Sequence, residues 1–365
     1  LTPAQADAFA AVERALDGGG GPLLLHGVTG SGKTEVYLRA IAAARARGRG
    51  AIVLVPEIAL TPQLGARLRA RLGEGVAVWH SGLLVVDEEH DASYKQDSSP
   101  RYDARQVAAR RAAAAGAAVV YGSATPRPET WHALPRATLG ERADGSPLPP
   151  VEVVDMRTQG PGPVSRPLAR ALHEAALRGE KAIVLASRRG FALMALCRAC
   201  GWIARCPRCD VALVQHEAPR RLACHHCGHE APVPSVCPSC DTAGVARQGT
   251  GSQGLEAALS RLVPSARLVR LDGSSAARRG AVARLLAEFA RPGPAILLGT
   301  QMVAKGHDLP AVTVAGVIDA DGPLQHPDFR AEERAFGLIV QVAGRAGRRG
   351  ERARVIVQAY EPEAR

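Results

Sequence analysis

The turn GVTGSGKT, from Gly27 to Thr34, constrains the fold more than any other stretch of the sequence. It follows the apolar run PLLLH and precedes the helix-like stretch TEVYLRAIAAARARG. In such a turn, glycines let backbone N–H groups close around phosphate oxygens, a lysine neutralises phosphate charge, and a hydroxyl ligates Mg²⁺. The alternative is a glycine-rich turn with an incidental lysine, and the flanking strand and helix argue against it. The candidate phosphate-binding residues are Gly27, Gly30, Gly32, Lys33 and Thr34.

Short apolar runs alternate with helix-like stretches from residue 22 to residue 125, and the alternation resumes at residue 167. This rhythm predicts an α/β fold with two lobes, each built on a parallel sheet. A stretch rich in glycine and proline separates the lobes, and a cysteine-rich segment interrupts the second. We expect a first, ATP-binding lobe over residues 1–145, a second lobe over 146–196 and 241–365, and an insert over 197–240.

Two carboxylates follow an apolar run in the first lobe. The run Leu83–Val86 leads directly into DEEH, as expected of a buried parallel strand that presents acids at its C-terminal end. Asp87 can hold Mg²⁺ through water, and Glu88 can orient or deprotonate an attacking water. Solvated strand-end acids are the alternative, which the neighbouring phosphate loop disfavours. The later segment GSATP offers hydroxyls that could couple the nucleotide site to motion.

Near the other end of the chain, QVAGRAGR places Arg345 and Arg348 three residues apart, on one face if the segment is helical. An arginine delivered from a second lobe can stabilise charge on a transferring phosphate, which makes hydrolysis depend on lobe closure. A basic helix end with favourable macrodipole placement is the alternative.

The spacing before the carboxylates is unusual. Residues 75–80 read as a second strand, and only Ser81 and Gly82 separate it from the run that starts at Leu83. Neighbouring parallel strands need a crossover of roughly a dozen residues or more. We therefore predict that a segment is missing here and that Gly82 and Leu83 are not covalent neighbours, so that their Cα atoms lie farther apart than about 3.8 Å.

All eight cysteines fall in four CxxC pairs, a pattern that favours metal over disulfides. Two pairs can close a structural zinc site, and four pairs can form two sites in three ways. The inner pairs are separated by fourteen residues, which is near zinc-ribbon spacing, so the outer pairs are left to meet. We expect bystander roles for His225, His226 and His229. The predicted sites are Cys206, Cys209, Cys224 and Cys227, and Cys197, Cys200, Cys237 and Cys240.

The chain of 365 residues is long enough to bury two or three cores. Its formal charge of +11 suits a polyanionic partner such as nucleic acid, although a solvated basic surface is the alternative. No secretory leader is evident, and no apolar run reaches the roughly 18 to 20 residues of a membrane span, so we expect a cytoplasmic protein with no membrane contact.

Taken together, GSGKT, DEEH, SAT and QVAGRAGR resemble a superfamily 2 helicase in the usual motif order. The strings GVTGSGKTEVY, DEEHDASYKQ, RYDAR and GTQMVAKGHDLP, with the eight-cysteine insert, resemble the primosomal protein N′ (PriA) family of replication-restart helicases. The resemblance implies two RecA-like P-loop lobes with a double-zinc insert. It implies an ATPase that depends on DNA, moves 3′ to 5′ on single strands at stalled or recombined forks, and uses ATP, Mg²⁺ and two Zn²⁺. The implied partners are single-stranded and forked DNA, restart proteins of the primosome, and single-stranded DNA-binding protein. We expect a monomer.

The resemblance also assigns roles within the nucleotide site. Gln5 would read the adenine, and Gln341 would join the nucleotide-binding set. Arg345 and Arg348 would sense the γ-phosphate. The phosphate-loop residues and the two strand-end carboxylates would keep the roles given above.

A DNA-binding set is implied as well. The segment Ser93–Arg105 corresponds to the family's aromatic-rich loop, which couples DNA contact to hydrolysis, although its tyrosines could equally be packing anchors. Asp319–Asp321 would line the interlobe cleft and the DNA track, with surface loops as the alternative reading. The candidate DNA contacts are Tyr94, Lys95, Arg101, Tyr102, Thr300 and Lys305, the last followed by Gly306.

Three features depart from the family pattern. A segment with a GTRSA motif, which normally separates HSG from DEEH, is absent. Gln253 stands where an acid is usual, as Gln106 does after RYDAR. Because the sequence begins at LTPAQ and stops at YEPEAR, we also expect it to lack the family's N-terminal DNA-binding regions and its C-terminal domain. A non-hydrolysing, fork-binding scaffold for primosome assembly is therefore the alternative function. A superfamily 2 translocase on RNA or duplex DNA is a further alternative, which the cysteine insert disfavours.

Overall fold

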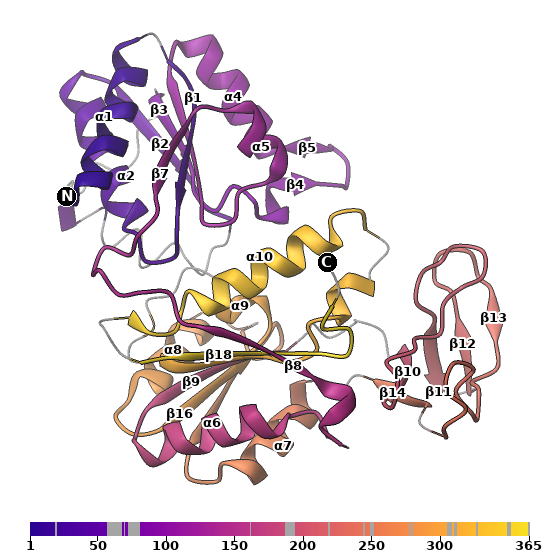
Figure 1. The fold of residues 1–365 in the computed structure, drawn as a ribbon. Coiled ribbons are helices and arrows are strands. Elements are labelled where there is room, and N and C mark those ends of the chain that lie inside the picture. The colour runs from indigo at the N-terminus through magenta and orange to yellow at the C-terminus, as the bar shows by residue number, and fades with distance from the viewer. Residues whose placement is uncertain are drawn as a thin grey trace. The chain divides into compact units, whose positions relative to one another are not determined.

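The computed structural model describes most of the chain and divides it into two compact units. Unit 1 covers residues 1–147 and unit 2 covers residues 148–365 (Figure 1). Within the described part of the chain, no helix is long and apolar enough to cross a membrane. The described residues are 1–18, 20–56, 68, 70–71, 81–160, 162–186, 194–217, 220–243, 245–248, 252–276, 278, 280–304, 309, 312–325, 328–348 and 352–363.

Unit 1 is built on a parallel sheet with the strand order β2-β3-β6-β1-β7. Figure 1 shows α1 and α2 on one side of this sheet and α4 on the other. Leu23 and Leu25 pack in the core with α1 and α2, whereas Leu24 between them packs with α4, because successive side chains of a strand point to opposite faces. The elements are α1 (Pro3–Asp17), β1 (Gly21–Gly27), α2 (Lys33–Ala46), β2 (Gly50–Leu54), β3 (Ser81–Val86), α4 (Ala104–Ala115), β6 (Ala118–Ser123), α5 (Pro128–Ala133) and β7 (Arg136–Leu139).

The junction between Gly82 and Leu83 does not show the break that the spacing predicted. Both residues lie in β3, and the pairing of β3 with β2 skips Gly82 as an irregularity in the register. Strand β3 extends back to Ser81, and a missing segment at this junction stays a prediction. A Cβ atom on Gly82 would overlap the side chain of Arg49, so the irregularity requires glycine. The strand predicted over residues 75–80 lies outside the described residues.

A small hairpin follows the carboxylates of β3. It consists of a 3₁₀ turn, η2 (Ala92–Tyr94), and two short antiparallel strands, β4 (Lys95–Gln96) and β5 (Tyr102–Asp103). Asp103 caps α4, because its side chain accepts a hydrogen bond from the backbone N–H of Arg105.

Unit 2 contains a second parallel sheet, with the order β15-β16-β9-β17-β18-β8. Helices α6 and α7 contribute to the core on one face, and α8 and α10 to the core on the other. The prediction of two parallel α/β lobes is confirmed. The elements are β8 (Val151–Asp155), η3 (Met156–Thr158), α6 (Arg166–Leu177), β9 (Lys181–Leu185), α7 (Ser252–Leu262), β15 (Arg267–Leu271), α8 (Ala281–Ala290), β16 (Ala295–Gly299), α9 (Gln301–Ala304), β17 (Val312–Val317), η4 (Gly322–Gln325), α10 (Ala331–Ala343) and β18 (Arg354–Ala359).

The cysteine-rich insert forms an antiparallel sheet of its own within unit 2. Its base packs where β8 and β18 end, and there Leu196 and Ile203 form a small cluster with Met156 and Tyr360. Its own core is small and includes Cys206 and Cys224. The strands are β10 (Met194–Cys197), β11 (Val214–Glu217), β12 (Arg220–Ala223), β13 (Glu230–Ala231) and β14 (Val245–Gln248).

Candidate nucleotide site and cysteine clusters

The phosphate loop connects β1 to α2. Gly30 and Gly32 both adopt left-handed backbone conformations, with φ of 89° and 83°, which glycine accepts without steric cost. Helix α2 begins at Lys33, so the loop presents the N-terminus of a helix. The ammonium of Lys33 donates to the carbonyl oxygen of Gly27 at 2.7 Å and thus folds back over the loop.

Gln5 contacts this loop from α1. Its side-chain amide donates to the carbonyl oxygen of Ser31 at 2.9 Å, and its amide oxygen accepts from the backbone N–H of Thr2 at 2.9 Å. The side chain of Thr2 in turn accepts from the backbone of Gln5, which completes a capping box. A Cβ atom on Gly32 would overlap the amide nitrogen of Gln5. Gln5 therefore ties the start of α1 to the phosphate loop, and adenine recognition by this residue stays a prediction.

Asp87 follows β3, is half-buried, and lies beside the phosphate loop. One of its oxygens accepts from the hydroxyl of Tyr37 on α2 at 3.0 Å and from the backbone N–H of Glu88 at 3.0 Å. Burial and the neighbouring Glu88 charge raise the pKa of Asp87 to about 6, and Lys33 opposes this rise. Glu88 has a left-handed backbone with φ of 49°. The structure thus places Lys33 and both carboxylates in one electrostatic environment.

The other two residues of DEEH contact the segment that contains SAT. Glu89 is fully buried, and its carboxylate accepts from the backbone N–H of Arg127 at 2.8 Å, from Nε of Arg127 at 3.1 Å, and from the hydroxyl of Thr130 at 2.9 Å. Nδ1 of His90 lies 2.7 Å from the hydroxyl of Ser123. The sequence-based prediction missed Glu89, Arg127 and Thr130, since no spacing rule connects a strand-end acid to residues 38 and 41 positions later.

The predicted DNA contacts on the hairpin have very different exposures. Tyr94 is only 5% exposed, and its hydroxyl donates to the carbonyl oxygen of Asp87 at 2.7 Å and lies 3.0 Å from that of Leu54. Its burial raises its pKa and favours the packing alternative for this ring. Tyr102, in contrast, is 48% exposed, and Lys95 and Arg101 are exposed as well.

The predicted γ-phosphate sensors lie beyond the end of α10. The helix ends at Ala343, so Arg345 and Arg348 occupy the turn that follows it and do not share a helix face. Arg345 and Gln341 are both buried, and Arg348 is half-buried. The sequence analysis expected the two arginines on one face of a helix only if the segment were helical, and this condition does not hold.

The remaining candidates of unit 2 lie near strand ends. Thr300 is buried directly after β16. Asp319 has a left-handed backbone with φ of 57°, and the buried carboxylate of Asp321 accepts from the backbone N–H groups of Tyr360 and Glu361. Asp321 therefore fixes the end of β18. Lys305 and Gly306, and the stretch 249–251 before Gln253, lie outside the described residues.

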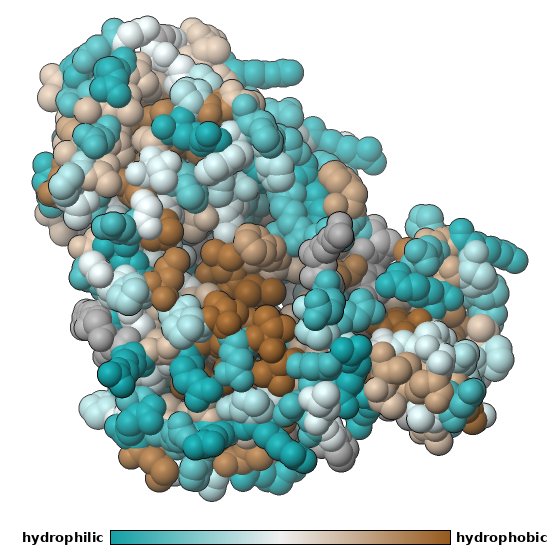
Figure 2. Space-filling view, viewed as in Figure 1, coloured by the Kyte–Doolittle hydropathy of each residue, from teal (hydrophilic) through white to brown (hydrophobic). Residues whose placement is uncertain are grey.

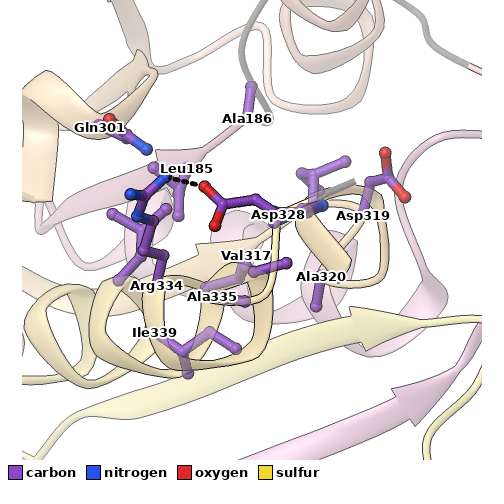
Figure 3. A pocket seen from close by; sticks show the side chains of 14 residues that line it. Leu185, Ala186, Gln301, Val317, Asp319, Ala320, Asp328, Arg334, Ala335 and Ile339 are labelled. Carbon is purple, nitrogen blue, oxygen red and sulfur yellow. Dashed lines mark hydrogen bonds and ion pairs between the residues drawn. The ribbon is translucent and has the colours of Figure 1, made fainter. Parts of the chain in front are cut away.

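An apolar cavity of about 160 Å³ lies in unit 2, where β9 and β17 end beneath α10 (Figure 3). Val317, Ala335 and Ile339 form part of its wall. Figure 3 shows the ion pair between Asp328 and Arg334, two residues that line the cavity, with the carboxylate and the guanidinium 2.5 Å apart. Figure 2 shows apolar side chains gathered on the surface in the region of α10.

The eight cysteines form two clusters, in each of which the sulfur atoms all lie within 4.8 Å of one another. The clusters have the nested pairing that the spacing predicted, and neither contains a histidine. Sulfur–sulfur distances are 3.6 Å for Cys197 and Cys240, and 3.6 Å for Cys206 and Cys227. A tetrahedral zinc site with Zn–S bonds of about 2.3 Å has edges of roughly 3.8 Å, so the residues fit zinc.

Each CxxC pair is held by the same backbone turn. The carbonyl oxygen of the first cysteine accepts from the N–H four residues later, and the N–H of that cysteine donates to the carbonyl oxygen five residues later. The residue four positions after the first cysteine has a left-handed φ in every turn, which selects glycine or aspartate. This signal is visible in the sequence as CRACG, CPRCD, CHHCG and CPSCD, and the sequence-based prediction did not use it. The residues are Gly201, Asp210, Gly228 and Asp241.

A phosphate loop and a half-buried strand-end carboxylate in one parallel α/β unit, followed by a second parallel α/β unit, are typical of the core of a DEAD/DEAH-type helicase. The DEAD/DEAH box helicase family model accordingly matches residues 2–82. Solved structures agree on the fold. One is Dbp5 from S. cerevisiae, bound to RNA and ADP BeF3, which superposes with a TM-score of 0.52 at 13% sequence identity. The superposition covers 98% of this chain and 87% of the Dbp5 chain. The other is the E. coli DExH-box NTPase HrpB, with a TM-score of 0.53 at 12% sequence identity. That superposition covers 99% of this chain and 42% of the HrpB chain.

The insert narrows the class further. Residues 206–232 match the model of the PriA DNA helicase Cys-rich region domain. The replication restart protein PriA of Bacillus subtilis is 41% identical to this chain, in an alignment that covers 99% of this chain and 51% of that protein. The replication restart protein PriA of Synechocystis is 40% identical, in an alignment that covers 99% of this chain and 50% of that protein. The chain belongs to the PriA replication restart protein family.

This chain is shorter than its relatives in two respects. It spans about half the length of the two curated relatives named above. In addition, the alignment with the Bacillus subtilis protein extends over 408 residues, 43 more than the 365 of this chain, so that relative has an internal segment without a counterpart here. The helicase family match ends at residue 82, the position at which the spacing anomaly was noted.

Proposed function

We propose that this chain is the ATP-hydrolysing core of a replication restart helicase that moves 3′ to 5′ on single-stranded DNA at stalled or recombined forks. The observation that carries the proposal is the shared environment of Lys33, Asp87 and Glu88 at the C-terminal ends of β1 and β3. In this proposal, Lys33 and Thr34 hold the phosphates. Family membership supports forked DNA, restart proteins of the primosome and single-stranded DNA-binding protein as partners.

The residues of unit 1 fit Mg²⁺ as the ion that accompanies ATP. Asp87 supplies a carboxylate, the ligand type that Mg²⁺ prefers, and the half-buried Glu88 next to it can accept a proton from an attacking water. The hydroxyl of Tyr37 holds Asp87 in place. From unit 2, we assign Arg345 and Arg348 to the stabilisation of charge on the γ-phosphate, and Gln341 to the nucleotide. From unit 1, we assign Gln5 to the nucleotide.

The insert fits two structural Zn²⁺ ions, since eight thiolates in two groups of four leave no open ligand position. We assign these ions to the stability of a module whose own core is too small to fold without them. Lys95, Arg101 and Tyr102 are the exposed residues of the hairpin that we assign to DNA contact.

A second candidate is a fork-binding scaffold that does not hydrolyse ATP, and the internal segment absent from this chain favours it. ATP turnover with and without single-stranded DNA separates the two functions. We expect turnover that single-stranded DNA stimulates and that Lys33→Ala abolishes. Turnover that is absent from the parent protein, or that persists unchanged in Lys33→Ala, would refute the enzyme and leave the scaffold.

A further inference from the structure

Tyr37 on α2 reaches the carboxylate of Asp87 through the packed interior of unit 1. Its side chain is only 2% exposed, and its hydroxyl donates to Oδ1 of Asp87 at 3.0 Å. Tyr37 follows Lys33 by four residues, so the two side chains lie on one face of the helix. The helix that begins at the phosphate loop therefore also holds the carboxylate at the end of the neighbouring strand.

Two donors converge on the same oxygen of Asp87. The backbone N–H of Glu88 donates to Oδ1 at 3.0 Å, and the hydroxyl of Tyr37 is the second donor to that atom. Carboxylates that ligate metal ions are held by hydrogen bonds of this kind, which orient the oxygen that meets the ion. With Oδ1 fixed, the place of the second oxygen, Oδ2, is fixed as well.

Gly122 on β6 makes room for the Tyr37 hydroxyl. It follows Tyr121, which pairs with Val86, and therefore lies level with Asp87 in the neighbouring strand. A Cβ atom on Gly122 would overlap the hydroxyl oxygen of Tyr37 and would lie 2.7 Å from the ring carbon Cζ. Any residue other than glycine would therefore displace the hydroxyl from Asp87.

The next acid, Glu88, has a buried atom that awaits a partner. Its Oε2 is buried and finds no hydrogen-bond donor within the described part of the chain. A buried acceptor without a donor is rare in proteins, and a water or an ion is a common reason for one. The oxygen that Tyr37 leaves to Asp87 thus belongs to a site suited to a hydrated ion.

We propose that Tyr37 is a positioning residue that occupies Oδ1 of Asp87 and so assigns Oδ2 to Mg²⁺, and that Gly122 is required to admit its hydroxyl. The inference rests on the proposed function and deepens it, because it names the groups that decide which oxygen serves the ion. Tyr37 contacts neither the nucleotide nor the ion in this scheme. Without its hydroxyl, the two oxygens become alternative ligands, and ordering of the carboxylate opposes the binding of the ion.

Binding of a fluorescent, non-hydrolysable ATP analogue tests this role without any turnover. The Kd is measured in EDTA and in Mg²⁺, and the ratio of the two values is the gain in affinity due to the ion. Tyr37→Phe removes a single atom and is expected to lower this gain about fivefold or more. Its Kd in EDTA should equal that of the parent protein, because Tyr37 does not contact the nucleotide.

Tyr121→Phe is the matched control. Tyr121 is also buried, but its hydroxyl donates to the carbonyl oxygen of Arg105 at 3.0 Å, and its ring packs in the core on the other face of the sheet. This variant should keep the parent gain.

Gly122→Ala supplies a second arm. In the parent protein it should lower the gain as Tyr37→Phe does, because the added methyl group displaces the hydroxyl. In Tyr37→Phe it should lower the gain little further, since the hydroxyl is already gone. If Gly122→Ala does not fold, Tyr37→Phe alone decides the outcome.

The parent protein and the variants separate the two claims. A parent protein whose Kd does not respond to Mg²⁺ refutes the assignment of the ion to Asp87 in the proposed function, and the inference with it. A parent gain that Tyr37→Phe retains, or a loss of affinity that is equal in EDTA and in Mg²⁺, overturns the positioning role of Tyr37 alone.

Discussion

Removal of the Arg127 side chain leaves the buried carboxylate of Glu89 without its charged partner. The carboxylate of Glu89 has no exposed area, and Arg127 supplies its charged partner, with its own side chain 22% exposed. Arg127→Ala leaves a fully buried carboxylate with two neutral donors, the backbone N–H of residue 127 and the hydroxyl of Thr130. Loss of one partner of a buried ion pair typically costs 3–5 kcal/mol, and the two remaining donors place this case near the lower end, at about 3 kcal/mol.

Urea unfolding measures this cost in unit 1 if the signal is local. Trp131 lies in α5 next to Thr130, so its fluorescence reports this region once Trp79 and Trp202 have been replaced by phenylalanine. Addition of Glu89→Gln to Arg127→Ala should recover part of the loss, because it removes the buried charge. Arg110→Ala is the exposed control and should change the free energy of unfolding by less than about 0.5 kcal/mol. A similarly small effect for Arg127→Ala would refute the electrostatic reasoning.

Four further results are expected. Because the pKa of Asp87 is raised to about 6, Mg²⁺-dependent turnover should fall as pH drops below about 6 and recover at higher Mg²⁺, whereas a Mg²⁺-independent fall would contradict the assignment. The same raised pKa means that the folded protein holds this proton more tightly than the unfolded chain, so the contribution of Asp87 to stability should decline as pH rises from about 4 to about 6. Gly32→Ala should weaken ATP binding, because alanine is strained at φ of 83° and its Cβ atom would overlap the side chain of Gln5. Gly48→Ala is the control, because its φ of 69° is also strained but no atom lies near the added Cβ. Metal analysis should give two zinc ions per chain, and Cys224→Ser should release one of them first.

Motifs with a fixed spacing were predictable because their chemistry is local. The loop from Gly27 to Thr34 must lie between a strand and a helix to present its N–H groups, and the four CxxC pairs could combine in only three ways. The buried connections of Glu89 were not predictable, since they depend on how α5 packs against the turn after β3. The burial of Tyr94 escaped prediction for a similar reason, because an aromatic residue in a polar loop gives no indication of the direction in which its ring points. The spacing anomaly at Gly82 indicated a real difference in length from the relatives, but the chain closes that gap within β3.

The nested arrangement of the cysteine clusters has a consequence for the order in which metal is acquired. Cys200 and Cys237 of the outer cluster are 37 positions apart, whereas Cys206 and Cys227 of the inner cluster are 21 apart. Once a metal ion joins Cys206 to Cys227, the loop between Cys200 and Cys237 no longer includes the residues between those two cysteines. The effective length of that loop is then less than half of its length in the open chain. Because each halving of a loop lowers the entropy cost of closure by roughly 0.6 kcal/mol, the first ion prepares the site of the second. Maturation of the insert should therefore proceed from the inner cluster to the outer cluster, and a shortage of zinc should leave the outer cluster open first.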